Sequence, residues 1–188
     1  CEMASPLPTL FLSWRIFHPG SDAARSPWFW IPFLSADRFS KSAKQVIEGG
    51  VMRVFFDTSA FVKRYVSEAG TDVVLEWCEQ ATEIVLSGIA LPEIISAFCR
   101  LQREDKITDT QYRQLKSLLM TDIEDAAICD LSPVVLMQTI TSLEKNVLRG
   151  MDAIHIGSAV ALKADVFISA DKRQLDAAAR MGLRVVSA

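Results

Sequence analysis

Short apolar runs alternate with helical segments over most of the chain, and this alternation restricts the fold more than any other feature. The runs typical of β-strands cover residues 53–56, 83–86, 126–129, 166–168 and 184–186. Apolar residues at helical spacing fill the intervals, at 59–66, 71–80, 91–103, 108–120, 134–146, 152–163 and 171–181. Buried strands separated by helices are typical of a parallel sheet that is covered on both faces. We therefore predict an α/β fold with a central parallel sheet flanked by helices.

The first 51 residues do not share this order. They hold five of the seven prolines and three of the four tryptophans, and their apolar residues clump at 28–34 with neither helical nor strand spacing. The codons for Glu48, Gly49 and Gly50 are purine-rich and lie just before Met52, where a bacterial ribosome-binding site would lie. We therefore expect translation to start at Met52, with an unstructured leader at 1–51 and one domain at 52–188.

The composition excludes several classes of protein. Half of the 188 residues are hydrophobic and the formal net charge is −3, so the chain can bury a core and is not intrinsically disordered. No apolar run approaches the roughly 20 residues of a spanning helix, so no membrane association is expected. The four cysteines lack the spacing of a zinc site or a disulfide framework. Reduced thiols and a cytoplasmic location follow.

Four carboxylates occupy the positions where an open α/β sheet binds its ligands, at the carboxyl ends of strands. Asp57 and Asp171 follow predicted strands, while Glu93 and Asp152 lie in the first turns of predicted helices. Each could merely cap a helix. Together they favour a shared site, because most lie in apolar stretches where an unpaired charge is costly. Oxygen ligands without Cys or His favour Mg²⁺ or Mn²⁺ over Zn²⁺.

Four motifs surround these carboxylates, which are separated by 36, 59 and 19 residues. The motifs are DTSA at 57–60, PEIISAFCR at 92–100, RGMDAIHIGSA at 149–159 and FISADKRQL at 167–175. In this order the segment 52–188 resembles the PIN-domain ribonucleases, particularly the toxins of VapBC toxin–antitoxin systems. The resemblance implies a three-layer fold around a five-stranded parallel sheet. It also implies Mg²⁺- or Mn²⁺-dependent cleavage of RNA phosphodiester bonds and inhibition by a cognate antitoxin.

The resemblance assigns roles to particular residues. It implies that the four carboxylates, as catalytic residues, bind one or two metal ions, directly or through water. Thr58 and Ser59 either position the loop and bind metal-bound water, or cap the following helix. Ser169 hydrogen-bonds a carboxylate or a metal-bound water. Arg100 reaches substrate phosphate or pairs with an acid, and His155 is a core or supporting residue rather than a general acid.

Two surfaces are also expected. Residues 52–188 carry 15 Lys and Arg against 19 Asp and Glu, so phosphate contacts must be local. The cationic candidates near the groove are Lys63, Arg64, Arg100, Lys172 and Arg173. The family resemblance implies a homodimer, and an apolar helix face with Leu115, Leu118 and Leu119 could form it.

Alternative functions are weighed by the residues around Asp57. A phospho-accepting receiver needs an acidic pair after its first strand, and a haloacid-dehalogenase-type phosphatase needs a second Asp where Ser59 stands. Glycine-rich phosphate loops are absent. A PIN-fold RNA- or protein-binding module without catalysis is the other alternative, and the presence of all four acids argues against it. Toxin and housekeeping nuclease are both compatible with the sequence.

Overall fold

The computed structural model describes residues 50–188, so all but the last two residues of the expected leader lie outside the described part. Its strands form one five-stranded, fully parallel sheet in the order β3-β2-β1-β4-β5. The strands are β1 (Arg53–Phe56), β2 (Glu83–Ser87), β3 (Ala127–Cys129), β4 (Val166–Ser169) and β5 (Val185–Ser187). The predicted α/β class and parallel sheet are therefore confirmed.

The helices fill the intervals between the strands, with two differences from the sequence prediction. The helices are α2 (Thr58–Phe61), η3 (Val62–Arg64), α3 (Thr71–Gln80), α4 (Ala90–Arg103), α5 (Asp109–Asp125), α6 (Pro133–Lys145), α7 (Gly150–Ala161) and α8 (Lys172–Arg180). The helix expected at 59–66 tightens after Phe61 into one 3₁₀ turn, closed by the amide of Tyr65 on the carbonyl of Val62. The helix expected to end at Met120 continues for five residues, because Asp122 is buried in an ion pair on its inner face.

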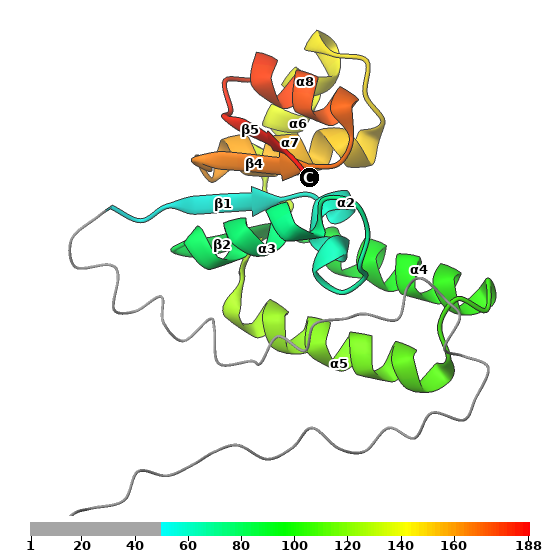
Figure 1. Ribbon diagram of the computed structural model, residues 1–188. Helices are drawn as coiled ribbons and strands as arrows, with labels where there is room; N and C mark the ends of the chain where they lie inside the picture. The colour runs from blue at the N-terminus through cyan, green and yellow to red at the C-terminus, as the bar shows by residue number, and fades with distance from the viewer. Residues whose placement is uncertain (1–49) are drawn as a thin grey trace, which may run out of the picture.

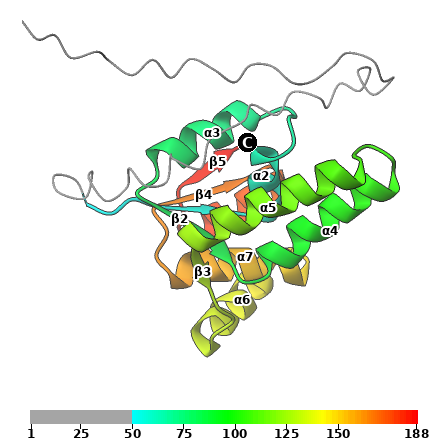
Figure 2. The same ribbon diagram turned by 90° about the horizontal axis from the view of Figure 1, so that it is seen from below.

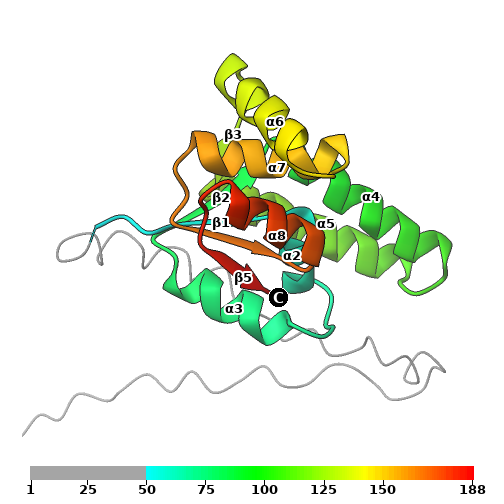
Figure 3. The same ribbon diagram turned by 90° about the horizontal axis from the view of Figure 1, so that it is seen from above.

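Helices cover both faces of the sheet, which gives three layers (Figures 1 and 3). One face packs against α2 to α5 and the other against α7 and α8, with α6 outside α7. Phe55 and Phe56 show why the central strand has apolar residues on both of its faces. Successive side chains of a strand point to opposite faces, so Phe55 enters one core and Phe56 the other.

Leu115 and Leu119 belong to the core on the α4–α5 side and are fully or almost fully buried, and Leu118 packs against the same cluster. The expectation that these leucines form a dimer surface is therefore wrong. Their spacing marks the face that α5 turns inward, towards α4 and the sheet. Figure 2 shows α4 and α5 lying side by side as a pair.

The order of the strands places a topological switch point between β1 and β4. The chain proceeds from β1 to β2 and β3 on one side, and then crosses to β4 and β5 on the other. Open α/β sheets bind ligands outside the carboxyl ends of the strands at this point.

Within the described residues, no helix has both the length and the apolar character needed to cross a membrane. Cys78, Cys99 and Cys129 are free thiols.

Candidate active site

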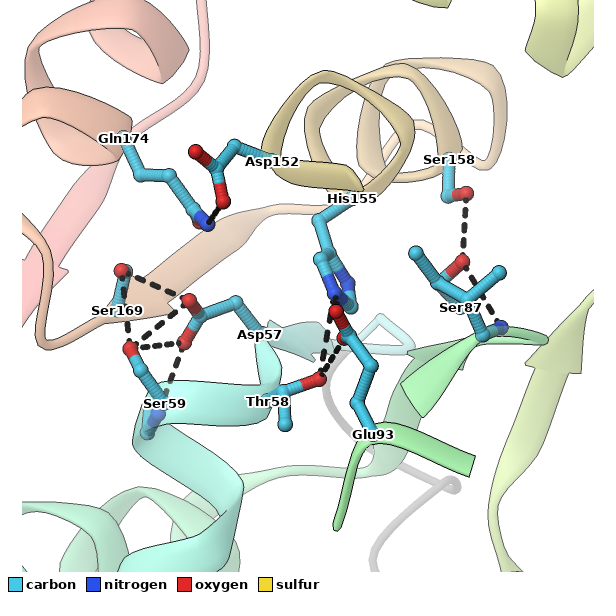
Figure 4. Close-up of polar contacts among 12 residues, drawn as sticks. Asp57, Thr58, Ser59, Ser87, Glu93, Asp152, His155, Ser158, Ser169 and Gln174 are labelled. Carbon is cyan, nitrogen blue, oxygen red and sulfur yellow. Dashed lines mark hydrogen bonds and ion pairs between the residues drawn. The ribbon is translucent and has the colours of Figure 1, made fainter. Parts of the chain in front are cut away.

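Asp57 lies at the switch point, directly after β1, and only 1% of it is exposed. Its carboxylate accepts hydrogen bonds from the Ser59 hydroxyl at 2.9 Å, the Ser169 hydroxyl at 3.0 Å and the amide of Ala60 at 2.8 Å (Figure 4). The last bond makes Asp57 the N-cap of α2. Burial raises the pKa of Asp57, and the charge of His155 together with these hydrogen bonds only partly offsets that rise. No Lys or Arg among residues 50–188 pairs with this carboxylate.

Glu93 lies in the first turn of α4, and side chains from two other elements fix its carboxylate. The Nε2 atom of His155 lies 2.8 Å from Glu93 Oε2, and the Thr58 hydroxyl donates to the same oxygen. Partial burial tends to raise the pKa of Glu93, but the hydrogen bonds from His155 and Thr58 outweigh it and lower the pKa. His155 is itself buried on α7 and touches Phe55 edge-on. It therefore supports Glu93, as the sequence favoured.

Asp152 and Asp171 come from later in the chain, at the starts of α7 and α8. Asp152 lies in the first turn of α7 and accepts a hydrogen bond from Gln174 Nε2 at 3.1 Å. Asp171 caps α8 by accepting from the amide of Arg173, and the guanidinium of Arg173 lies 3.2 Å from its second oxygen. These hydrogen bonds from Arg173 lower the pKa of Asp171, against a smaller effect of burial.

Ser169 connects Asp171 to the centre of the site. Its hydroxyl accepts from the amide of Asp171 at 2.9 Å and donates to Asp57. In Figure 4, Asp57 lies between Asp152 with Gln174 on one side and Glu93 with His155 on the other. All the acids picked out in the sequence thus lie at the carboxyl end of the sheet, each held by hydrogen bonds within the protein.

Two of the cations expected to face a phosphate do not do so. Lys63 is buried and donates to the carbonyls of Ala69 and Ala188. Arg64 forms a bidentate ion pair with Asp122. Helical spacing alone cannot reveal that these side chains turn inward from the 3₁₀ segment η3, so this part of the prediction is wrong.

The other cations remain at the surface. Arg100 and Lys172 are exposed, and within the described residues neither forms an ion pair. Arg173 is largely exposed despite its contact with Asp171.

The donor atoms of the site suit a hydrated Mg²⁺ or Mn²⁺. They are carboxylate, hydroxyl and amide oxygens, and Asp57 is a buried carboxylate that no Lys or Arg of the described part of the chain pairs with. Within residues 50–188, no three His, Cys, Asp or Glu side chains are close enough to hold one ion together. Mg²⁺ does not require such a cage, since it commonly keeps several waters and takes one or two carboxylates plus substrate phosphate. The residues therefore fit a hydrated ion held by few direct ligands.

An acidic site at the switch point of a parallel three-layer α/β domain defines the class of this protein. The family model of the PIN domain matches residues 54–180, and the chain belongs to the PIN-domain family. Over 142 aligned residues it is 29% identical to Ribonuclease VapC45 of Mycobacterium tuberculosis. The alignment covers 72% of this chain and 95% of the relative.

Solved structures share the fold at lower identity. VapBC2 from Rickettsia felis, crystallised with a DNA fragment from its promoter, matches with a TM-score of 0.54 and 18% identity over 73% of this chain and 99% of the other. A toxin–antitoxin complex from Klebsiella pneumoniae matches with a TM-score of 0.50 and 13% identity over 65% of this chain and 89% of the other. At these identities the likeness concerns the fold.

Gln174 is the residue of this site that the sequence reading missed. In the sequence, the pattern Asp171-x-x-Gln174 is typical of a capping box, in which the glutamine would bond back to the cap. Asp171 does cap α8, but the Gln174 side chain crosses to Asp152 on α7. The only signal in the sequence was a glutamine among the apolar positions of that helix, which marks a buried polar group without naming its partner.

Proposed function

We propose that this protein is a divalent-metal-dependent endoribonuclease whose active site is the carboxylate cluster Asp57, Glu93, Asp152 and Asp171. The supporting observation is the position of Asp57, which lies buried at the switch point of a PIN-domain sheet without a Lys or Arg partner among residues 50–188. The catalytic domain is residues 52–188, and residues 1–51 are the leader. The match of the PIN model to residues 54–180 supports this boundary.

The residues of the site divide the work between them. A bound Mg²⁺ or Mn²⁺ supplies an activated water and charge compensation at the phosphate. Asp57 at the switch point and Asp152 at the start of α7 offer carboxylate oxygens. His155 and Thr58 both bind Oε2 of Glu93 and so hold this carboxylate in one orientation. Its other oxygen, Oε1, is then the one that can bind the metal ion or its water. Arg100 and Lys172 are the exposed cations that can contact the RNA backbone.

The protein acts as the toxin of a type II toxin–antitoxin pair, in the cytoplasm. A relative of 29% identity is named a VapC ribonuclease, and structures that share the fold include a toxin–antitoxin complex and a VapBC pair. An antitoxin that blocks the carboxylates would be the natural partner of such a site. RNA is the proposed substrate because the relative of 29% identity is named a ribonuclease, and an acidic metal site can hydrolyse the phosphodiester bonds of RNA.

The decisive experiment measures cleavage of a structured RNA by the purified full-length chain. With Mg²⁺ we expect multiple-turnover cleavage, and with EDTA we expect a loss of at least about 100-fold, since the ion contributes several kcal/mol to the transition state. Excess Mg²⁺ or Mn²⁺ should restore the activity, and Ca²⁺ serves as the comparison ion. Undiminished cleavage in EDTA would contradict the metal assignment. RNA binding without cleavage under all conditions would favour the non-catalytic module.

The surface that we propose for homodimerisation is the outer face of α6. It exposes large apolar side chains: Val134, Leu136, Met137, Ile140 and Leu143. Residues 131–143 contain no charged side chain, and the charged residues of α6, Glu144 and Lys145, lie exposed at its end, so two copies can meet along Val134 to Ile140 without burying a charge. Its inner face packs on α7 so closely that a Cβ on Gly157 would lie 2.4 Å from the Thr139 hydroxyl. The outer face is therefore presented by a fixed helix, and a second copy of the chain is the occupant that matches its lack of charge.

Met137→Glu is expected to convert the dimer into a monomer. Met137 is 60% exposed near the middle of α6. A two-fold axis that passes through this face near Met137 would bring the two glutamates together in an apolar contact. Light scattering after size-exclusion chromatography measures the mass. Lys116→Glu, on an exposed position of α5, is the matched control and should leave the dimer intact. A wild-type protein that is monomeric, or a Met137→Glu protein that is still dimeric, contradicts the proposed surface.

A further inference from the structure

We propose that Gln174 is a further member of the metal site, with a different task for each end of its amide. Its Nε2 group positions Asp152, and its Oε1 oxygen accepts a hydrogen bond from a water of the bound cation. This inference rests on the proposed metal-dependent function, to which it adds a ligand-shell residue.

The burial of Gln174 is the first observation. The residue lies in the first turn of α8 and is only 4% exposed, although it is polar. Its side chain leaves α8 and donates from Nε2 to Asp152 Oδ1 on α7, at 3.1 Å. In Figure 4 the end of this side chain lies between Asp152 and Asp57. The amide is therefore placed among the carboxylates rather than at the surface.

The unpartnered oxygen is the second observation. Within the described residues, Gln174 Oε1 is buried and has no hydrogen-bond partner. Reversing the amide cannot relieve this, because an ionised carboxylate only accepts hydrogen bonds and needs the NH₂ group on its side. The contact with Asp152 therefore fixes the carbonyl oxygen on the other side, as an acceptor without a donor. A buried acceptor of this kind is costly unless something supplies the donor.

A hydrated divalent cation supplies such a donor. Mg²⁺ keeps several of its waters when proteins bind it, and each bound water has two protons for acceptors in the surrounding shell. Groups that orient the ligands of a metal normally lie in this shell. Packing alone does not account for the amide, since a leucine of similar size would fill the space between α7 and α8 without a buried polar oxygen.

The test measures Mn²⁺ binding by calorimetry, on the metal-free full-length protein without RNA. Gln174→Leu removes both ends of the amide, and we expect Mn²⁺ to bind at least about tenfold more weakly. Gln174→Glu keeps an acceptor oxygen and adds a negative charge while it loses the donor to Asp152. We expect this variant to bind Mn²⁺ at least as tightly as the wild type. Gln114→Leu, on an exposed position of α5, is the matched control and should change nothing.

Thermal melting without metal separates binding from folding. Gln174→Leu should melt no lower than the wild type, because it removes a buried oxygen without a partner. If the branched leucine disturbs α8, Gln174→Met takes the place of Gln174→Leu in the test, because methionine keeps the length of the glutamine side chain. A merely structural role would lower the melting temperature of the Leu and Glu variants alike and would leave Mn²⁺ affinity unchanged.

The outcomes distinguish this inference from the proposed function. Wild-type affinity in Gln174→Leu, with metal-dependent cleavage intact, overturns the role of Gln174 alone. Weakened Mn²⁺ binding in both the Leu and the Glu variants overturns the role of the carbonyl oxygen, because the acceptor oxygen of the glutamate then fails to restore the affinity. A wild-type protein that binds no Mn²⁺ and cleaves no RNA overturns the inference together with the proposed function.

Discussion

Asp57→Asn is expected to reduce RNA cleavage by on the order of 10³-fold while the domain stays folded. The loss follows from removing a charge that compensates the cation, which is worth several kcal/mol in the transition state, at about 1.4 kcal/mol for each tenfold. The fold should tolerate the change, because the hydroxyls of Ser59 and Ser169 can accept from an amide as well as donate to a carboxylate. Single-turnover cleavage at saturating Mg²⁺ measures the effect.

The melting temperature of metal-free Asp57→Asn should equal or exceed that of the wild type. Burial raises the pKa of Asp57, so at neutral pH the charged form costs stability that the neutral amide does not. Asp165→Asn is the matched control, since Asp165 is exposed and precedes β4 at the opposite edge of the sheet. It should cleave RNA at the wild-type rate. Wild-type activity in Asp57→Asn would place the reaction elsewhere on the protein.

The strands could be predicted because the sheet is buried on both faces. Phe55 and Phe56 enter different cores, so consecutive residues of this strand, Val54 to Phe56, had to be apolar. The ends of helices were less certain. The helix that contains Asp122 carries a charge on its inner face. A prediction from apolar spacing takes such a charge as the end of the buried face, and it therefore ended this helix too early.

The sequence predicted that the acids gather at the carboxyl end of the sheet, because they follow strands or stand at the starts of helices. The partners of these acids could not be predicted, since they depend on packing between elements distant in the chain. His155 reaches Glu93 across 62 positions, and Gln174 reaches Asp152 from another helix. The same limit explains the errors at Lys63 and Leu119, because periodicity shows that one face is buried but does not show which neighbour covers it.

Asp122→Ala is expected to destabilise the domain by about 3 kcal/mol, which is roughly a hundredfold in the folding equilibrium. The carboxylate of Asp122 accepts from Arg64 at 2.6 and 3.0 Å and from the Tyr65 hydroxyl at 2.7 Å. Burial and this neighbouring carboxylate both raise the pKa of Tyr65, so the phenol stays protonated as a donor. The cluster ties the C-terminal part of α5 to η3, the turn that follows Asp57 and α2. Urea denaturation measures the loss.

Burial is the reason for so large an effect, and two further variants test that reason. The side chains of Arg64 and Asp122 are only 11% and 9% exposed, so removing the carboxylate leaves a buried guanidinium without its main counter-charge. Glu83→Ala breaks the exposed pair with Arg53, at 38% and 46%, and should cost less than about 1 kcal/mol. The double variant Arg64→Met, Asp122→Leu should regain much of the loss, since it replaces the charges with apolar side chains. If the double variant is instead less stable than Asp122→Ala, the pair stabilises the fold by its own attraction, and the cost of an unpaired buried charge is not the cause.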